Sequence, residues 1–231
     1  MNNMITTIAF DADDTLWDNE SYFQEIEKAF CMLLSDYLPQ HSVSQELFKT
    51  EMQNLSLYGY GIKGFMLCMI ETVSRISDNN ASLQLVNETI KLGQELLQKP
   101  VELLEGVTST LENLKGNFRL VVATKGDLLD QERKLKKSGL LDNFHHIEVM
   151  SDKRVCDYNK LLKHLDCKPE NFLMVGNSIK SDILPVLEIG GFAAHVPYHI
   201  TWQHEQQDHK VNHNHFVGLK SINEVLAYLS Q

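Results

Sequence analysis

Two aspartates separated by one residue follow a short apolar run near the start of the chain. The run covers residues 4–10 (MITTIAF), and Asp11 and Asp13 come directly after it. If the backbone stays extended there, both carboxylates point to the same side of the chain and share one site. One carboxylate could then attack an electrophilic centre such as phosphorus, while its neighbour acts as general acid and base. The alternative is that both aspartates serve only as turn or cap residues.

Polar side chains follow three further apolar runs in the same way. Because parallel strands present their carboxyl ends at one edge of a sheet, side chains at these positions would meet there. Four strand ends that deliver carboxylates, a hydroxyl, a lysine and an amide indicate a site. The runs are residues 118–123, 144–150 and 171–175, and the residues of interest after them are Thr124, Lys125, Gly126, Lys153, Asn177 and Asp182.

Strands and helices alternate through the second part of the chain. A fifth apolar run covers residues 191–196, and helical patterns separate the runs at 127–138, 157–165 and 179–189. This alternation predicts an α/β fold with a Rossmann-like parallel sheet that is covered on both faces.

Residues 18–99 break the alternation because their apolar residues recur only at spacings of three and four, which is typical of helices. Candidate helices cover residues 21–37, 44–57, 63–76 and 82–98, and Pro100 ends the last of them. We therefore expect two domains, an α/β core of residues 1–17 and 100–231 and an inserted all-helical domain of residues 18–99.

Carboxylates gathered at one edge repel each other and raise one another's pKa unless a cation joins them. A hard divalent cation with oxygen ligands, for which we expect Mg²⁺, would resolve the repulsion and leave room for a phosphate oxygen. Thr124 offers a hydroxyl and Lys153 a positive charge to the oxygens of a phosphoryl group. The sequence thus favours a magnesium site that handles a phosphate ester.

In order, spacing and strand context, these residues resemble the motifs of the haloacid dehalogenase-like (HAD) hydrolase superfamily. The first motif, Asp-x-Asp-x-Thr, matches residues 11–15, and the second, a Thr or Ser that ends a strand, matches Thr124. The third, a lysine, maps to Lys153 in preference to Lys160, which falls inside a predicted helix. The fourth, Gly-Asp-x-x-x-x-Asp, maps to residues 176–182, and the helical insert is similar to the family's cap domain.

The resemblance implies a role for each matching residue. Asp11 would be the nucleophile that forms a phosphoaspartyl intermediate, and Asp13 the general acid and base. Asp11, the backbone carbonyl of Asp13 and Asp182 would hold Mg²⁺. Dehalogenases of the family typically lack the second aspartate, so Asp13 favours hydrolysis of phosphate esters.

Three positions depart from the family pattern. Asn177 stands where many relatives have aspartate, although an amide oxygen can still bind Mg²⁺ or a coordinated water. Lys125 and Gly126 follow Thr124 where many relatives have asparagine, and Lys125 becomes a candidate phosphate contact. Lys153 is followed by Arg154 instead of the common proline.

The glycine-flanked loop at residues 58–65 of the insert allows two interpretations. Tyr60 and Lys63 could select the substrate, and a mobile loop could exclude water from a phosphoryl site. Equally, the loop could be an ordinary connection between helices.

Six histidines fall between residues 195 and 215. A transition-metal site is conceivable there, but the polar composition of residues 201–214 favours a surface loop. The histidines are His195, His199, His204, His209, His213 and His215.

Composition narrows the class of protein. The chain has 231 residues, and 21 basic against 31 acidic residues give a net charge of −10, which argues against a nucleic-acid partner. No apolar run approaches the length of a membrane span. Four cysteines without Cys-x-x-Cys spacing indicate neither a disulfide framework nor a zinc site. We expect a cytoplasmic monomer or homodimer.

The sequence therefore predicts a Mg²⁺-dependent phosphatase that acts on a small phosphorylated metabolite, such as a phosphoglycolate-like acid, a sugar phosphate or a nucleotide. A relative that binds phosphate ligands without hydrolysis and a haloacid dehalogenase are the alternatives. A signalling receiver domain is disfavoured, since such domains lack a helical insert of this size.

Overall fold

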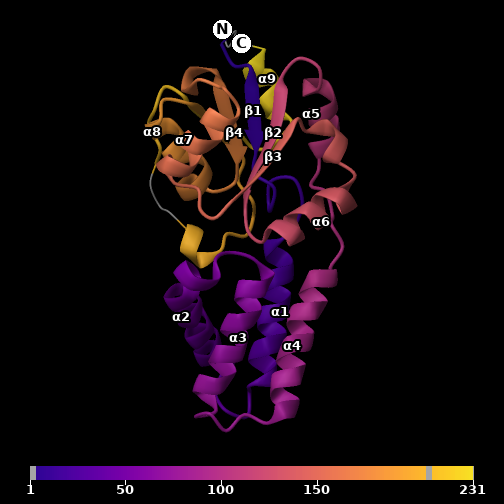
Figure 1. The fold of residues 1–231 in the computed structure, drawn as a ribbon, viewed down its shortest axis with the longest axis vertical. Helices are drawn as coiled ribbons and strands as arrows, with labels where there is room; N and C mark the ends of the chain where they lie inside the picture. The colour runs from indigo at the N-terminus through magenta and orange to yellow at the C-terminus, as the bar shows by residue number, and fades with distance from the viewer. Residues whose placement is uncertain (1–3, 207–209, 231) are drawn as a thin grey trace. The chain divides into compact units, whose positions relative to one another are not determined.

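The computed structural model describes residues 4–206 and 210–230. Within them, six parallel strands form one sheet with the order β3-β2-β1-β4-β5-β6, which places β1 near its centre (Figure 1). The strands are β1 (Thr7–Phe10), β2 (Arg119–Lys125), β3 (His146–Met150), β4 (Phe172–Gly176), β5 (Phe192–His195) and β6 (Phe216–Gly218).

Helices cover both faces of this sheet. Alternate residues of a strand point to opposite faces, and in β1 and β4 the residues on both faces are buried. Ile8 and Phe10 pack into one apolar cluster together with residues of α5, α6 and α9. Ala9, between them, belongs to a second cluster with residues of α7 and α8. The helices are α5 (Val107–Leu114), α6 (Leu128–Ser138), α7 (Val155–His164), α8 (Leu184–Glu188) and α9 (Glu224–Leu229).

The helical insert has an apolar core of its own. Fully buried side chains such as Phe30, Leu47 and Met69 come from three of its helices, which run alongside one another (Figure 1). These helices are α1 (Glu20–Leu33), α2 (Gln40–Tyr58), α3 (Ile62–Ile76) and α4 (Leu83–Gln98).

The chain divides into two compact units. The α/β unit contains residues 1–20, 101–125 and 132–231, and the helical unit contains residues 21–100 together with 126–131. The short segment 126–131, which the sequence pattern assigned to the α/β core, groups with the helical unit, and there Lys63 Nζ lies 2.8 Å from Asp127 Oδ1.

The two segments that lead into and out of the insert pair with each other inside the α/β unit. Trp17 and Leu103 form an antiparallel bridge. The amide of Leu104 donates to the carbonyl of Leu16 at 3.0 Å, and that of Asp18 to the carbonyl of Glu102 at 3.0 Å. The insert therefore leaves and rejoins the α/β unit through adjacent strands of backbone.

The predicted fold class is confirmed, one predicted helix needs correction, and two short elements were not predicted. β6 was not predicted, because its three residues are too few to show a periodic pattern. The segment expected to be one helix over residues 179–189 begins as a π-helical turn, η3 (Ile179–Ile183), and only then becomes α8. The predicted surface loop contains a short 3₁₀ turn, η4 (Gln203–Glu205). Asp127 caps the start of α6, since its Oδ1 accepts the amide of Asp130 at 3.1 Å.

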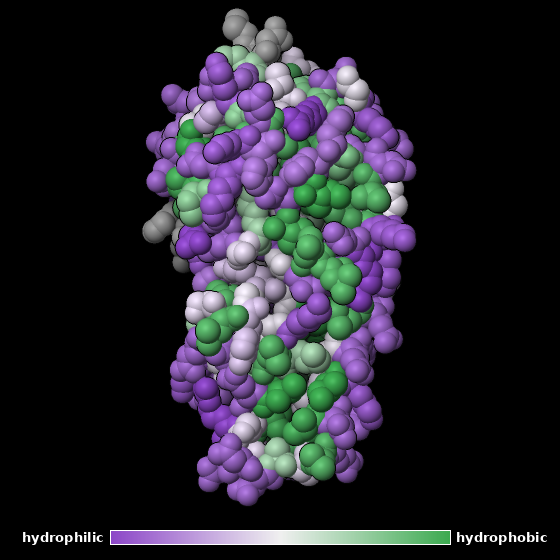
Figure 2. Space-filling view, in the orientation of Figure 1, coloured by the Kyte–Doolittle hydropathy of each residue, from purple (hydrophilic) through white to green (hydrophobic). Residues whose placement is uncertain are grey.

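The surface of the helical unit carries both polar and exposed apolar side chains, and apolar residues adjoin one another on the face drawn in Figure 2. Leu57 and Leu83 are 77% and 83% exposed. In the part of the chain that the structure describes, no helix is both long enough and apolar enough to cross a membrane.

Candidate active site

Three of the predicted residues form a buried ionic cluster at the carboxyl ends of β1, β3 and β4. Lys153 Nζ lies 2.5 Å from Asp11 Oδ1 and 2.6 Å from Asp182 Oδ1. The amide of Asp11 donates to the carbonyl of Val175 at 2.9 Å, which extends the pairing of β1 with β4 by one residue. The side chains of Lys153 and Asp182 are each 1% exposed. The sheet therefore brings together residues that are up to 171 positions apart.

The cluster has more negative than positive charge in a buried place. Burial raises the pKa of Asp11 to about 7; Lys153 opposes this rise, whereas Asp182 adds to it. Burial disfavours the charged form of Lys153, but Asp11 and Asp182 outweigh it and raise the lysine's pKa above its usual value. Lys153 is therefore a cation in this site, and an additional cation or a proton would relieve the remaining repulsion between the carboxylates.

Ser178, in the turn after β4, holds both the backbone and the side chain of Asp182. The amide of Asp182 donates to the carbonyl of Ser178 at 2.8 Å. Asp182 Oδ2 accepts the amide of Ser178 at 2.9 Å, and the Ser178 hydroxyl accepts the amide of Ser181 at 3.0 Å. Gly176 permits this arrangement, because a Cβ added to it would lie 2.3 Å from Asp182 Oδ2. The glycine of the fourth motif thus leaves room for the side chain of the motif's last residue.

Asp13 hydrogen-bonds to residues outside this cluster, although its charge also helps to raise the pKa of Asp11. The backbone turns after Asp11, since the amide of Leu16 donates to the carbonyl of Ala12 at 2.8 Å. Asp13 Oδ1 accepts Trp17 Nε1 at 2.7 Å and Lys134 Nζ at 2.6 Å. Asp13 and Asp11 therefore contact different partners, although they come from the same strand end.

Two further predicted residues lie at the edge of the cluster. The Thr15 hydroxyl is 3.5 Å from Asp11 Oδ2 and 3.4 Å from Asn177 Oδ1, so it links the loops after β1 and β4. Thr124 is buried at the end of β2, where its hydroxyl donates to the carbonyl of Lys125 at 3.2 Å. Thr124 therefore lies at the end of the strand that pairs with β1, and Asp11 directly follows β1.

Lys125 turns toward a residue that the sequence pattern did not single out. Its Nζ lies 2.5 Å from Glu205 Oε1 and 2.9 Å from the Ser181 hydroxyl. Gly126, the next residue, has a φ of +125° and leads the chain into α6. Glu205 belongs to no recognisable motif and lies in a polar segment, so nothing in the sequence marked it.

Tyr60 and Lys63 belong to the helical unit. Tyr60 is half-buried just before α3, and Lys63, in the first turn of α3, is exposed and pairs with Asp127. Their proposed contact with a substrate stays a prediction.

The described histidines of residues 195–215 have different partners and do not all gather at one place. His195 Nε2 lies 2.9 Å from the carbonyl of Asn177, and His204 Nε2 lies 2.9 Å from Lys180 Nζ. The ring of His199 contacts that of Tyr198, and His213 and His215 contact each other. His209 falls outside the described residues.

The donor chemistry of the cluster suits a hard cation. Among residues 4–206 and 210–230, no three His, Cys, Asp or Glu side chains are close enough together to hold a metal ion. Magnesium needs only one or two carboxylates, because it keeps several waters and accepts neutral oxygen ligands. Asp11 and Asp182, supplemented by amide and backbone oxygens, meet this need.

Comparison with known proteins places the chain in a family. Residues 5–190 match the model of the haloacid dehalogenase-like hydrolases. A curated relative, the glyceraldehyde 3-phosphate phosphatase of Methanothermobacter thermautotrophicus, is 28% identical over 89% of this chain and 91% of its own.

Solved structures agree with this match. A haloacid dehalogenase-like family hydrolase of Xanthomonas campestris has a TM-score of 0.87 and 34% identity over 98% of this chain and 92% of its own. A putative HAD-hydrolase of Bacillus subtilis, described as bound to magnesium, has a TM-score of 0.64 and 20% identity over 99% and 100%. Haloacid dehalogenases share the fold at 13–19% identity. The motifs, the fold and the family match over most of its length together make the chain a member of the haloacid dehalogenase-like hydrolases.

Proposed function

We propose that the protein is a Mg²⁺-dependent phosphomonoester hydrolase that acts on a small phosphorylated metabolite through a phosphoaspartyl intermediate. The observation that carries the proposal is the buried cluster in which Lys153 joins Asp11 and Asp182. It combines a nucleophile, a cation for phosphoryl oxygens and a carboxylate for a metal at the carboxyl edge of a parallel sheet, where such folds place their ligands.

Asp11, Asp182, the amide oxygen of Asn177 and the backbone carbonyl of Asp13 would hold the metal. When bound, Mg²⁺ would neutralise negative charge on the phosphoryl group and on the carboxylates. Burial and the charge of Asp182 both raise the pKa of Asp11. A divalent cation bound to both carboxylates would offset their mutual repulsion, which supports this assignment.

The chain's own residues supply the other steps. A carboxylate oxygen of Asp11 forms a bond to phosphorus as the bond to the leaving oxygen breaks, and Asp13 gives that oxygen a proton. Asp13 then takes a proton from water, whose oxygen attacks phosphorus and releases phosphate and free Asp11. Lys153 and Thr124 bind phosphoryl oxygens, where charge is spread in the transition state.

The helical unit would act as the cap, and its loop with Tyr60 and Lys63 would select among substrates. The named activity of the curated relative supports sugar phosphates of three or so carbons as the first compounds to test. A haloacid dehalogenase is the second candidate, favoured by the shared fold and disfavoured by Asp13.

The test is hydrolysis of an aryl phosphate and of a panel of small phosphorylated metabolites by the pure protein, with Mg²⁺ and with EDTA. Asp11→Asn and Asp13→Asn are compared with Asp142→Asn, a matched substitution at an exposed position of the α/β unit. We expect metal-dependent release of phosphate that falls by at least about 100-fold in the first two variants, since each removes a reacting group.

Full activity in Asp11→Asn would contradict the proposal. Silence toward every phosphate ester, with halide release from a 2-haloacid in the absence of metal, would favour the dehalogenase. Binding of a phosphorylated metabolite without turnover would instead identify a ligand-binding relative.

A further inference from the structure

Glu205 connects three points at the carboxyl edge of the sheet. Its carboxylate contacts Lys125 Nζ at the end of β2 at 2.5 Å, the Ser178 hydroxyl at 2.5 Å and the Ser181 hydroxyl at 2.7 Å. The side chain of Glu205 is 11% exposed and that of Lys125 is 15% exposed. The carboxylate therefore has one cationic and two hydroxyl partners in a mostly buried place.

The two serines that Glu205 binds are the residues that support Asp182. Ser178 donates its amide to Asp182 Oδ2 at 2.9 Å, and Ser181 directly precedes Asp182 in the π-helical turn η3. A second link lies beside the first, since Lys180 Nζ donates to the carbonyl of His204 at 3.0 Å. Two consecutive residues of the segment after β5, His204 and Glu205, therefore bind two consecutive residues of this turn, Lys180 and Ser181.

We propose that Glu205 is a positioning residue that fixes the turn carrying Asp182, and that Lys125 anchors this turn instead of binding the substrate's phosphate. The inference rests on the proposed function, because Asp182 is assigned there to the metal. It also revises the expectation from the sequence, in which Lys125 was a candidate phosphate contact.

The ionisation of Glu205 agrees with this role. Burial opposes it, but Lys125, helped by the hydroxyls of Ser178 and Ser181, lowers the pKa of Glu205 to about 2. The carboxylate is therefore charged at neutral pH and compensates the charge of Lys125. A phosphate group that approached Lys125 would have to displace this carboxylate, which already has three partners.

The two roles of Lys125 predict different kinetics. If Lys125 anchors the turn, Lys125→Met and Glu205→Ala both weaken Mg²⁺ binding, and neither changes KM for an aryl phosphate by more than about twofold. Substitution of a residue that orients a metal ligand typically lowers metal affinity or activity by about 10- to 100-fold. If Lys125 binds phosphate, Lys125→Met raises KM and leaves Mg²⁺ affinity unchanged.

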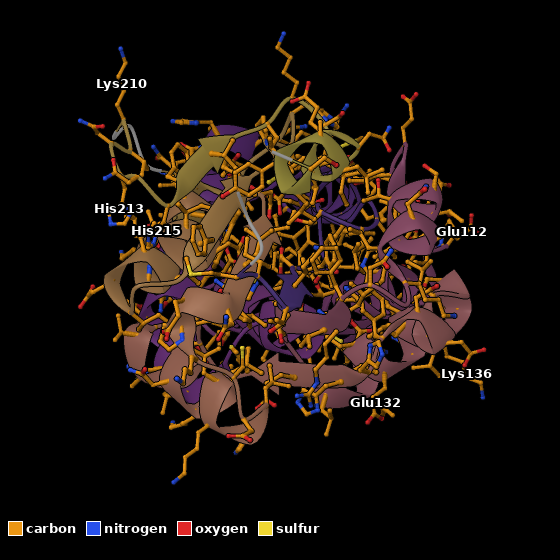
Figure 3. The ribbon with its side chains drawn as sticks, turned by 90° about the horizontal axis from the view of Figure 1, so that it is seen from above. Glu112, Glu132, Lys136, Lys210, His213 and His215 are labelled. Carbon is orange, nitrogen blue, oxygen red and sulfur yellow. The ribbon has the colours of Figure 1, made fainter. Side chains whose placement is uncertain are left out.

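The experiment measures Mg²⁺ binding by calorimetry, with the metal alone, and KM and kcat separately, for wild type, Glu205→Ala, Glu205→Gln, Lys125→Met and the double variant Glu205→Ala/Lys125→Met. Glu112→Ala is the matched control, because Glu112 is exposed on α5 and projects outward (Figure 3). We expect a roughly tenfold loss of Mg²⁺ affinity in Glu205→Ala and in Lys125→Met, and a smaller loss in Glu205→Gln, which keeps its length but not its charge. The double variant should lose little more than either single variant, because coupled residues are not additive.

The inference would be overturned if Glu205→Ala and Lys125→Met bound Mg²⁺ as tightly as Glu112→Ala does. It would also be overturned if KM rose in Lys125→Met alone. Should Glu205→Ala fail to fold, Glu205→Gln and Lys125→Met carry the same comparison. The binding measurement needs no turnover, so a protein that binds Mg²⁺ but hydrolyses no phosphate ester would contradict the proposed function while still testing the role of Glu205.

Discussion

Gly176 sets how closely the end of β4 can approach Asp182. An added Cβ would lie 2.3 Å from Asp182 Oδ2, so Gly176→Ala must push this carboxylate away from Ser178 and Lys153. We expect phosphatase activity to fall by about 100-fold or more, since displacing a functional group by about 1 Å can have an effect of this size.

Gly218→Ala, at the end of β6, is the matched substitution for Gly176→Ala. Its nearest neighbour would be 3.9 Å from the added Cβ, and the variant should keep its activity. Equal activities of the two alanine variants in the aryl phosphate assay would contradict the role assigned to Gly176.

Lys153 provides the positive charge between two buried carboxylates. Lys153→Met should abolish activity and destabilise the protein by about 3–5 kcal/mol, the usual result of removing one partner of a buried ion pair. Because a divalent cation then becomes the remaining counter-charge, Mg²⁺ should raise the melting temperature of this variant more than that of wild type.

The comparison is made by thermal denaturation with Mg²⁺ and with EDTA, beside Lys136→Met. Lys136 is exposed on α6 and points outward (Figure 3), so its variant should behave as wild type does. An identical Mg²⁺-dependent shift in the Lys153 variant and in the control would show that the lysine and the metal do not share the two carboxylates.

Single residues were predictable from the sequence where they close a strand. Asp11, Thr124 and Lys153 each follow an apolar run, and the parallel sheet leads all such ends to one edge. The hydrogen-bond partners of Asp13 were not predictable, because they depend on the turn at residues 12–16, which backbone hydrogen bonds determine and a two-residue period does not reveal. Glu205 was missed because a polar segment gives no sign of which of its side chains turns inward.

Helix α2 carries a partly buried carboxyl group, that of Glu51, whose ionisation opposes folding. Burial, and then the neighbouring Glu27, raise the pKa of Glu51 to about 8. An acid with a raised pKa stabilises the fold only while protonated, so its contribution is complete below about pH 4.5 and is lost as the pH rises through 8. Glu51→Gln removes this dependence.

We expect Glu51→Gln to melt at the same temperature as wild type near pH 4.5 and several degrees higher at pH 9, since each pKa unit corresponds to about 1.4 kcal/mol. Glu95→Gln, at an exposed position of α4, is the control. A melting difference between Glu51→Gln and wild type that does not grow from pH 4.5 to pH 9 would show that the group titrates normally.

Elements were predictable in proportion to their length and regularity. The long helices of the insert repeat their apolar positions over several turns, so their pattern is clear. The turn η3 reads as α-helix in the sequence, yet the bond from Ser178 to Asp182 and the π-helical spacing reshape it. β6 pairs with β5 through only three residues, so it is a strand because of its hydrogen bonds with the edge strand β5 and not because of its own sequence pattern.

The molecule as a whole has separate apolar cores in its two units, and such proteins often depart from a single unfolding transition. Leu47 is fully buried in the helical unit and Leu120 in the α/β unit. Leu47→Ala and Leu120→Ala should each lower stability by about 2–5 kcal/mol, but in different transitions. Calorimetry that shows one transition, shifted alike by both substitutions, would contradict independent unfolding.

Because Trp17 pairs with Leu103, the two ends of the helical insert lie next to each other, so that another segment could replace the insert. Its two ends leave the α/β unit side by side and are fastened there by backbone hydrogen bonds that depend little on side-chain identity. Any segment whose own termini lie close together could be spliced between these two strands at little cost in chain entropy, because closure entropy grows only slowly with loop length. An exchange at this point would leave Asp11, Lys153 and Asp182 in place, because all three belong to the α/β unit.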